Sequence, residues 1–563
     1  MHPARLSSKL ALLAALTLVL AACSGPASSS QPSAGSSGTA TGGTVRIGIG
    51  GSPDSLNPGD AYLSEAYTLF ELVYDTPINL TADGNYEPEL AKSWTLSDDG
   101  LTWTLELVDN ATFHDGTPLT SADVKFTLEL YRDTGDYPYM PSYPDVFTSI
   151  EAPDATHVTL TSEEAIGNFE SRMVFMYILP KHIWEGQDPV DFDNAAMIGS
   201  GPFKLVENKQ GEFTRLATNT DYWKTPPFVD GVIFQTFQNP DARVAALTND
   251  DVDMITEFPA TAIAALQNAD NVTVAITDPV AGSLRDVFFN LVDPADCPTA
   301  DGGVCTGHPA LRDLEVRKAL ATAVDKEQII NVAQLGLAVP GLTLVPITLG
   351  GGEYYASDVA DYAFNVDEAN GILDAAGYHD TNGDGVRECK PNQGCDDLTF
   401  RVNFSEDNDT APREAELLQG MWEAIGVKVT IQALDADTLT SVCCPSFDYD
   451  VIIWTWGSDP DPDFIIGVPT CGAISSGTNE TGYCNPEYDA LDVAQGVEVD
   501  HDARVAIIKQ MQQILVDDVV YIVPYYDQQK QAYRNDRFTG WWDGQASWGL
   551  EDPSSLTVVR PVQ

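Results

Sequence analysis

Two tryptophans and a row of aspartates follow one another in residues 447–463, FDYDVIIWTWGSDPDPD. The run Val451–Trp456 consists of β-branched and aromatic residues, which predicts a buried strand ending at Gly457. Ligand sites of open α/β sheets lie at the carboxyl ends of strands. An indole offers a flat amphipathic surface, and a carboxylate can accept a charge-assisted hydrogen bond from an ammonium group. The stretch therefore indicates either a binding site or a core strand followed by an exposed acidic turn.

The N-terminus predicts export and a lipid anchor. Residues 1–22 contain Arg5, Lys9 and an apolar run at 10–20 that is short for a membrane span, as in a signal peptide. Small residues directly precede Cys23. This is the lipobox pattern, in which a signal peptidase cuts the chain before the cysteine and the cysteine is lipidated. Residues 23–43 are rich in Ser, Gly and Ala and read as a flexible tether. We expect a lipid-anchored protein on the cell membrane, facing the periplasm or the extracellular space.

The composition is strongly acidic, with a formal net charge of −55 at pH 7. Nucleic acid is excluded as a partner, because phosphate binding needs a basic face. Hydrophobic residues make up 43% of the chain, which is ordinary for a globular protein and argues against a disordered acidic chain. The 563 residues exceed a single core, so two or three lobes are expected.

Eight cysteines remain after Cys23, and an even number in an exported protein predicts disulfides. Close spacing favours the pairs 297–305, 389–395 and 471–484. The adjacent Cys443 and Cys444 either close on each other or exchange partners with a neighbouring cluster. No spacing fits a zinc site, and no cofactor or metal is predicted.

The first strand is expected at Thr44–Gly50, and the loop 50–58 that follows could place backbone amides and Ser52 in a cleft. Asp-Gly turns at residues 99–100 and 115–116 flank alternating strands, and Thr120 or Ser121 caps a helix. Later, an amphipathic helix is expected at 412–425, ending before Gly426, and a strand follows at 427–431. This order predicts a β-α-β unit.

The stretch SDDGLTWTLELVDNATFHDGTPLTSADVKFTLE at 97–129 resembles the signature of the family 5 extracellular solute-binding proteins of ABC importers, which bind oligopeptides, dipeptides or nickel. Further matching motifs follow in order at 199–205, 219–223 and 314–325. The resemblance runs from about Thr44 to the C-terminus, with an inserted cysteine-bearing loop at 294–308.

The resemblance implies an α/β fold of the type II periplasmic-binding-protein class, with two lobes closing on a cleft and an extra inserted lobe. We expect lobe I in 44–80, 198–284 and 521–563, the inserted lobe in 81–197, and lobe II in 285–520. Peptide would be gripped through its backbone in the cleft and delivered to a membrane permease with its ATPase subunits. The protein is expected to be a monomer and not an enzyme.

The resemblance also assigns site residues. The family's W-x-x-D strand end matches Trp456-Gly457-Ser458-Asp459, so Asp459 would receive the peptide α-ammonium. Trp456, Gly457, Trp454 and Ser52 are the further candidates for ligand contact.

One departure bears on the ligand. Dipeptide binders hold the ligand carboxylate with an arginine and a tyrosine just beyond a strand that corresponds to 399–404, where this chain has Ser405-Glu406-Asp407-Asn408-Asp409. Acids cannot bind a carboxylate, which argues against strict dipeptide specificity. It leaves longer peptides, a cationic solute or an oligosaccharide, unless the turn is merely solvated.

Asp380–Glu388 fits the first half of a calcium loop, but position 12 is Pro391 and calcium is the lesser interpretation. The rival functions are a peptide-sensing receptor of the same fold and a secreted two-carboxylate hydrolase. No nucleophile elbow, zinc-protease or phosphate-loop motif is present in the sequence.

Overall fold

The computed structural model describes residues 41–563 except 82, 280–281, 300–301, 543–545 and 548. The predicted signal peptide, the lipidation site Cys23 and most of the tether lie outside these residues. Within the described residues the strands form sheets of eight, six and four strands and two two-stranded ribbons.

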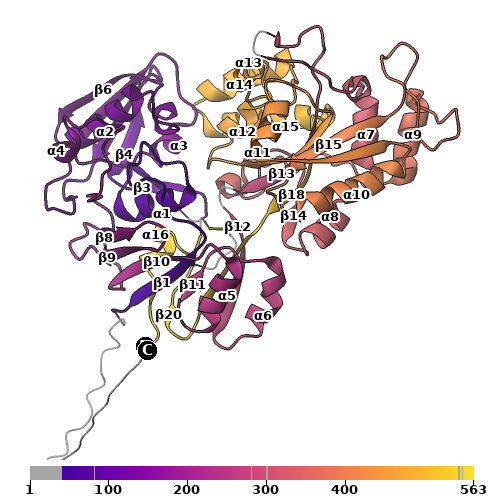
Figure 1. The fold of residues 1–563 in the computed structure, drawn as a ribbon. Coiled ribbons are helices and arrows are strands. Elements are labelled where there is room, and N and C mark those ends of the chain that lie inside the picture. The colour runs from indigo at the N-terminus through magenta and orange to yellow at the C-terminus, as the bar shows by residue number, and fades with distance from the viewer. Residues whose placement is uncertain (1–40, 82, 280–281, 300–301, 543–545, 548) are drawn as a thin grey trace, which may run out of the picture. The chain divides into compact units, whose positions relative to one another are not determined.

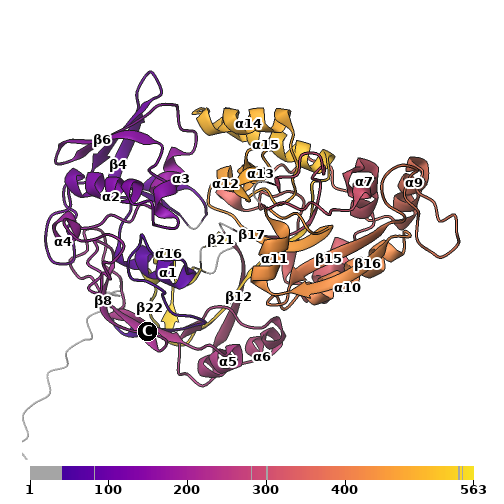
Figure 2. The same cartoon turned by 45° about the horizontal axis from the view of Figure 1, so that its top comes forward.

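The eight-stranded sheet is mixed, with β1 parallel to both of its neighbours, β10 and β11. Its order is β21 (Ala546–Ser547), β12 (Val272–Pro279), β19 (Gln529–Arg534), β11 (Met254–Ile255), β1 (Thr44–Ile49), β10 (Gly231–Thr236), β9 (Phe213–Thr218) and β8 (Phe203–Lys209). Helices α5 (Pro240–Thr248) and α6 (Ile263–Gln267) lie side by side against β11 and β12 (Figures 1 and 2).

The six-stranded sheet has the order β14 (Ala338–Pro340), β18 (Tyr521–Asp527), β13 (Ser283–Phe289), β17 (Val451–Gly457), β15 (Thr399–Ser405) and β16 (Lys428–Leu434). The run predicted as a buried strand is β17, and its side chains alternate between two cores. Val451 and Ile453 pack in one cluster with Trp422, while Ile452 packs in another with Ile508. The first three residues of β17 are buried on both faces of the sheet, which explains the apolar run Val451–Ile453, whereas Thr455 and Gly457 near its end are exposed.

Helices cover both faces of this sheet (Figure 1). One cluster is completed by α7 (Leu314–Thr322), α8 (Lys326–Ala333), α9 (Val366–Ala376) and α10 (Ala411–Glu423). The other is completed by α11 (Ala436–Cys443), α12 (Asp463–Gly467), α13 (Ala473–Ser476), α14 (Pro486–Val497) and α15 (His501–Asp517). Helix α10 ends close to its predicted boundary, and Gly426 takes a positive φ of 77° that favours glycine at that stop.

The four-stranded sheet is antiparallel, in the order β4 (Ala91–Leu96), β5 (Thr102–Leu107), β7 (His157–Ser162) and β6 (Phe147–Asp154). Thr120 and Asp123 form the capping box of α2 (Ser121–Asp133), as the sequence predicted for one of two neighbouring residues. The remaining elements are α1 (Ser64–Val73), α3 (Phe169–Met173), α4 (Lys181–Trp184), α16 (Pro553–Leu556), β2 (Ile78–Leu80) with β3 (Tyr86–Pro88), and β20 (Phe538–Thr539) with β22 (Arg560–Pro561). Short 3-10 turns span Met140–Ser142, Ala260–Ala262, Pro309–Arg312 and Leu349–Gly352.

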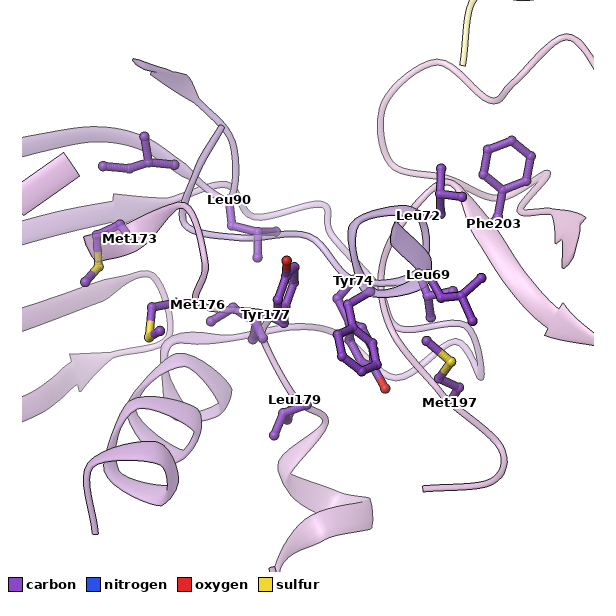
Figure 3. Close-up of a cluster of buried hydrophobic side chains, with 14 of the residues drawn as sticks. Leu69, Leu72, Tyr74, Leu90, Met173, Met176, Tyr177, Leu179, Met197 and Phe203 are labelled. Atoms are coloured by element: carbon purple, nitrogen blue, oxygen red, sulfur yellow. The ribbon is translucent and has the colours of Figure 1, made fainter. Parts of the chain in front are cut away.

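The four-stranded and eight-stranded sheets share one apolar cluster, which joins Val45 of β1 to Leu105 of β5. Figure 3 shows its central part, where Leu69 and Leu72 of α1 lie near Tyr74. These two sheets therefore share one continuous core, to which α1 contributes.

One predicted boundary differs from the observed strand pairing. Residues 521–563 were expected together in lobe I, whereas β18 pairs with β13 and β14 in the six-stranded sheet and only β19 pairs in the eight-stranded sheet. Since β18 is buried over nearly its whole length, its apolar pattern suits a central position in either sheet. The chain thus passes from one sheet to the other at Gln528, and the other lobe boundaries stay predictions.

Three of the predicted disulfides are present, Cys297–Cys305, Cys389–Cys395 and Cys471–Cys484. The alternative left open by the sequence is resolved in favour of a bond between the neighbours Cys443 and Cys444.

Candidate functional site

A cavity of about 1020 Å³ lies where the chain passes between the eight-stranded and six-stranded sheets. The end of β17 contributes Gly457 and Asp459, and the passage from β18 to β19 contributes Asp527 and Gln529. The segment from β1 through α1 supplies much of the opposite wall, including Tyr62, Tyr67 and Glu71. Pockets of this size hold small-molecule ligands. The strand ends form one wall of the site, and the segment from β1 through α1 forms the other.

The three aspartates of the turn after β17 have different environments. Asp461 is buried and forms a bidentate ion pair with Arg504, with both N–O distances 2.6 Å. Asp463 accepts hydrogen bonds from Gln495 Nε2 at 2.5 Å and from Asn168 Nδ2 at 3.0 Å. Both carboxylates therefore hold the protein together and are not available to a ligand.

Asp459 is the acid of this turn that faces the cavity. It is half-buried, and no hydrogen bond or ion pair joins its carboxylate to any other residue in the described part of the chain. Burial raises the pKa of Asp459 to about 6, helped by the negative charges of Asp461 and Asp463. An ammonium group entering the cavity would lower the pKa of Asp459 again, because an opposite charge stabilises the carboxylate. The predicted residue Asp459 therefore lines the cavity, and its contact with an ammonium group stays a prediction.

The other predicted site residues lie near the cavity but differ in what they contact. Gly457 lines it. Trp456 donates its indole N–H to Glu480 Oε1 at 3.0 Å, and Trp454 packs on the cluster around α15. Ser52 is hydrogen bonded to Thr236 at 2.9 Å and braces the loop after β1. These three side chains have structural partners here, and their contact with a ligand stays a prediction.

The sequence did not identify the acidic character of the whole cavity. Among its described lining residues one side chain is basic, Lys530, and these are acidic: Glu65, Glu71, Glu257, Asp459, Asp527, Glu551 and Asp552. Arg243 lies behind the wall, buried and within electrostatic range of Glu65 and Glu257. The one local signal was Glu71, a charged residue inside the apolar run Leu69–Val73 of α1.

The acidic turn that departs from the dipeptide-binder pattern lies elsewhere. Glu406, Asp407 and Asp409 are exposed, and none of them is among the described residues that line the cavity. Asn408 contacts the buried Arg285 at 3.1 Å and ties the turn to the sheet. The three acids thus have the environment of a solvated turn.

The calcium interpretation gains no support. Asp380 and Glu388 use their carboxylates to accept backbone N–H groups of their own loop. Among the described residues, the one group of potential metal ligands with atoms within 4.8 Å of one another is His308 with Cys389 and Cys395. Both cysteines are in a disulfide and have no thiolate to offer.

In the part of the chain that the structure describes, none of the helices combines the length and the hydropathy needed to cross a bilayer.

The structure thus combines an α/β architecture with a cavity between two of its sheets, the arrangement expected from the sequence. The model of bacterial extracellular solute-binding proteins, family 5, matches residues 85–473, and the chain belongs to this family. The resemblance drawn from the sequence motifs and the expected fold class are thereby confirmed.

Relatives cover nearly the whole chain. The oligopeptide-binding protein AppA of Bacillus subtilis is 26% identical over 93% of this chain and 93% of its own length. The dipeptide-binding protein of Escherichia coli is 25% identical over 84% of this chain and 87% of its own. Among solved structures, the ABC transporter substrate-binding protein CtaP of Listeria monocytogenes superposes with a TM-score of 0.78 at 27% identity, covering 93% of this chain and all of that one.

Proposed function

We propose that this protein captures oligopeptides outside the cytoplasm and delivers them to the permease of an ABC importer. The observation that carries the proposal is the Asp459 carboxylate, which faces a cavity of about 1020 Å³ without a partner among the described residues. The names of the relatives AppA and the Escherichia coli dipeptide-binding protein support a peptide as the solute.

In this function Asp459 receives the α-ammonium of the peptide. The peptide backbone would lie along the passages between the sheets, beside the ends of β17 and β18. Closure of the two walls would exclude bulk water and strengthen the ion pair. The bound solute undergoes no covalent change, and the permease recognises the closed form.

The volume favours a peptide longer than two residues. The exposed position of Glu406, Asp407 and Asp409 removes the argument that these acids repel a ligand carboxylate. The sequence of that turn, residues 405–409, also contains no arginine and no tyrosine that could hold a dipeptide carboxylate. An oligosaccharide is the second candidate in the same fold, and Tyr62 and Tyr67 on the cavity wall would then stack on sugar rings.

The first experiment identifies what co-purifies with the full chain, by denaturation and mass spectrometry of the released small molecules. Peptides of mixed sequence and narrow length range are expected. Oligosaccharide, or a single solute without an amine, would overturn peptide capture while keeping the fold.

The second experiment tests Asp459 directly. Calorimetric titration of Asp459→Asn with a free-amine peptide should show affinity about 10- to 100-fold weaker, because a hydrogen bond to a charged group contributes about 1.5–3 kcal/mol. The N-acetylated peptide should bind the parent chain and the variant equally. Equal loss for both peptides would mean that Asp459 acts only on the shape of the turn.

A further inference from the structure

The loop between β7 and α3 contacts the helices that cover the six-stranded sheet. The backbone N–H of Gly167 donates to the carbonyl oxygen of Gly496, near the end of α14, at 2.9 Å. The next residue, Asn168, donates its side-chain Nδ2 to Asp463 Oδ2, at the start of α12, at 3.0 Å. Two consecutive residues beside the four-stranded sheet are therefore hydrogen bonded to two helices of another sheet.

The close approach at this loop requires glycine at position 167. A Cβ atom there would lie 2.6 Å from the carbonyl oxygens of Gln495 and Glu498, and 3.0 Å from Arg504 Cδ. Gly167 does not have the positive φ that favours glycine for its backbone freedom. Its lack of a side chain therefore matters where the loop touches α14, and any larger residue would push the two apart.

The polar partners of the contact are already oriented on their own sides. Arg172 Nε donates to Asn168 Oδ1 at 2.9 Å, which leaves the Nδ2 of the same amide directed at Asp463. The other oxygen of Asp463 accepts from Gln495 Nε2 at 2.5 Å. Groups that are held in position before they meet lose little conformational entropy when they pair. The bond between Asn168 and Asp463 is thus preorganised from both ends.

A second close approach lies at the ribbon of β2 and β3. A Cβ atom on Gly84, in the turn between these strands, would lie 2.8 Å from the backbone nitrogen of Gly351. The hydroxyl group of Tyr86, on β3, is within electrostatic range of Asp461 and Tyr354. The regions thus approach each other at two separate places.

Arg172 connects the loop contact to the cavity. Besides holding Asn168, its Nη1 donates to the carbonyl oxygen of Tyr143 at 3.1 Å. The rings of Tyr143 and Phe175 pack with their centroids 5.2 Å apart, and Phe175 lines the cavity together with Asp459. The Tyr143 hydroxyl is itself within electrostatic range of Asp459. A movement of the loop away from α14 would therefore move a part of the cavity wall as well.

We propose that the segment Gly167–Phe175 is a clasp that holds the cavity closed over its solute, with Gly167 engaging α14 and Asn168 engaging α12. Release of the solute requires the two hydrogen bonds of the clasp to break, so the clasp acts on the dissociation rate more than on the association rate. This inference rests on the proposed function, because it concerns how the solute captured there is retained.

The first test measures how fast a solute leaves. The full chain is loaded with pentaalanine that carries a fluorophore at its C-terminus, and unlabelled peptide is added in excess in a stopped-flow instrument. Gly167→Ala should release the peptide at least about ten-fold faster, and Asn168→Ala about three- to ten-fold faster, as for the loss of one hydrogen bond. The association rate should change less than two-fold in both variants.

Gly135→Ala is the matched control for the added methyl group. Gly135 is an exposed glycine outside the clasp, it has no positive φ, and an added Cβ would meet no atom within 4 Å. This variant should release the peptide at the parental rate. If thermal unfolding shows that Gly167→Ala does not fold, Asn168→Asp replaces it, because aspartate has nearly the shape of asparagine.

The second test needs no solute. In the ligand-free full chain the Gly167 amide should exchange its hydrogen slowly, because it is bonded to the Gly496 carbonyl oxygen. Asn168→Asp places a second carboxylate against Asp463 and should speed this exchange about ten-fold at pH 8, whereas Gly135→Ala should leave it unchanged. Hydrogen exchange read by mass spectrometry with fragmentation of the peptides resolves the single amide.

The outcomes separate the clasp from peptide capture. If the clasp variants release pentaalanine at the parental rate, the contact does not retain the solute, and the inference fails while peptide capture stands. If the Gly167 amide of the parent chain exchanges without protection, the contact does not form and the inference fails too. If pentaalanine does not bind the parent chain, peptide capture fails. The clasp is then judged by the exchange measurement and by the release of the solute that co-purifies.

Discussion

Asp459 and Asp461 are two residues apart in one turn and have opposite roles. Asp461 is buried with a bidentate arginine partner, whereas Asp459 is half-buried, faces the cavity and has no partner among the described residues. Proline lies on the C-terminal side of each, so the local sequence does not distinguish them. The difference lies in the helix that packs against the turn, because α15 brings Arg504 to Asp461 and no cation to Asp459. One acid of the repeat therefore has a structural partner, and the other faces the cavity without one among the described residues.

The largest effect is expected from removing the structural charge. Asp461→Asn leaves the Arg504 guanidinium buried without its counter-ion, which should lower the free energy of unfolding by about 3–5 kcal/mol. Urea denaturation followed by tryptophan fluorescence measures the loss. Glu416→Gln removes an exposed partner of Arg413 on α10 and should cost less than about 1 kcal/mol. Equal losses in the two variants would contradict the buried pair as a main support of the turn.

Replacing Asp459 by Asn should raise the free energy of unfolding instead of lowering it. Its pKa in the folded protein is raised to about 6 from 3.8, so folding opposes its ionisation; this cost begins above pH 4 and is complete above pH 6. Asp459→Asn removes the cost and should stabilise the ligand-free protein by about 1–2 kcal/mol at pH 8. At pH 3 the difference should vanish, because the carboxyl is then protonated in both states.

The measurement is a pair of denaturation curves for the ligand-free protein, at pH 8 and at pH 3. A stability loss at pH 8 would show that the Asp459 carboxylate has a partner in the folded protein, and the contrast with Asp461 would disappear.

Affinity for a free-amine peptide should follow the ionisation of Asp459. Below pH 6 the carboxyl is protonated and its charge-assisted hydrogen bond weakens, so affinity for pentaalanine should fall by up to about ten-fold per pH unit. Titration calorimetry between pH 4.5 and 7 measures the slope. The Asp459→Asn variant and the N-acetylated peptide should each give a flat profile, and a slope that persists in the variant would assign the titration to another group.

The sequence was informative where one segment carries the whole signal. The apolar run of β17 predicted a buried strand, and the resemblance to the family's W-x-x-D strand end singled out Asp459, which lines the cavity. The ion pair of Asp461 with Arg504 could not be predicted, since α15 contributes its arginine from a later helix. Nor could the meeting of Glu71 with Glu551, which lie at opposite ends of the chain.

Strand order shows the same limit. The segment Tyr521–Asp527 was recognised as a strand from its apolar residues, but its partners were not. Hydrogen bonds to β13 and β14 are made by the backbone, and the side chains of a strand buried on both faces do not specify which sheet surrounds it. The passage at Gln528 that helps to line the cavity was displaced in the prediction for this reason.

The smallest effect is expected at the acidic turn that first argued against a dipeptide. Replacing Glu406 by Gln and Asp407 and Asp409 by Asn together should change the free energy of unfolding by no more than about 0.5 kcal/mol, as for exposed residues without partners in the structure. Affinity for pentaalanine should change less than two-fold, because these acids do not line the described cavity and salt screens charges at such distances. A larger gain in affinity, strongest at low salt, would show that the turn repels the ligand carboxylate after all. Exposed acids would then act on the ligand through long-range electrostatic repulsion and not only through direct contact. The comparison of Asp459 with Asp461 would have to include every exposed acid near the cavity.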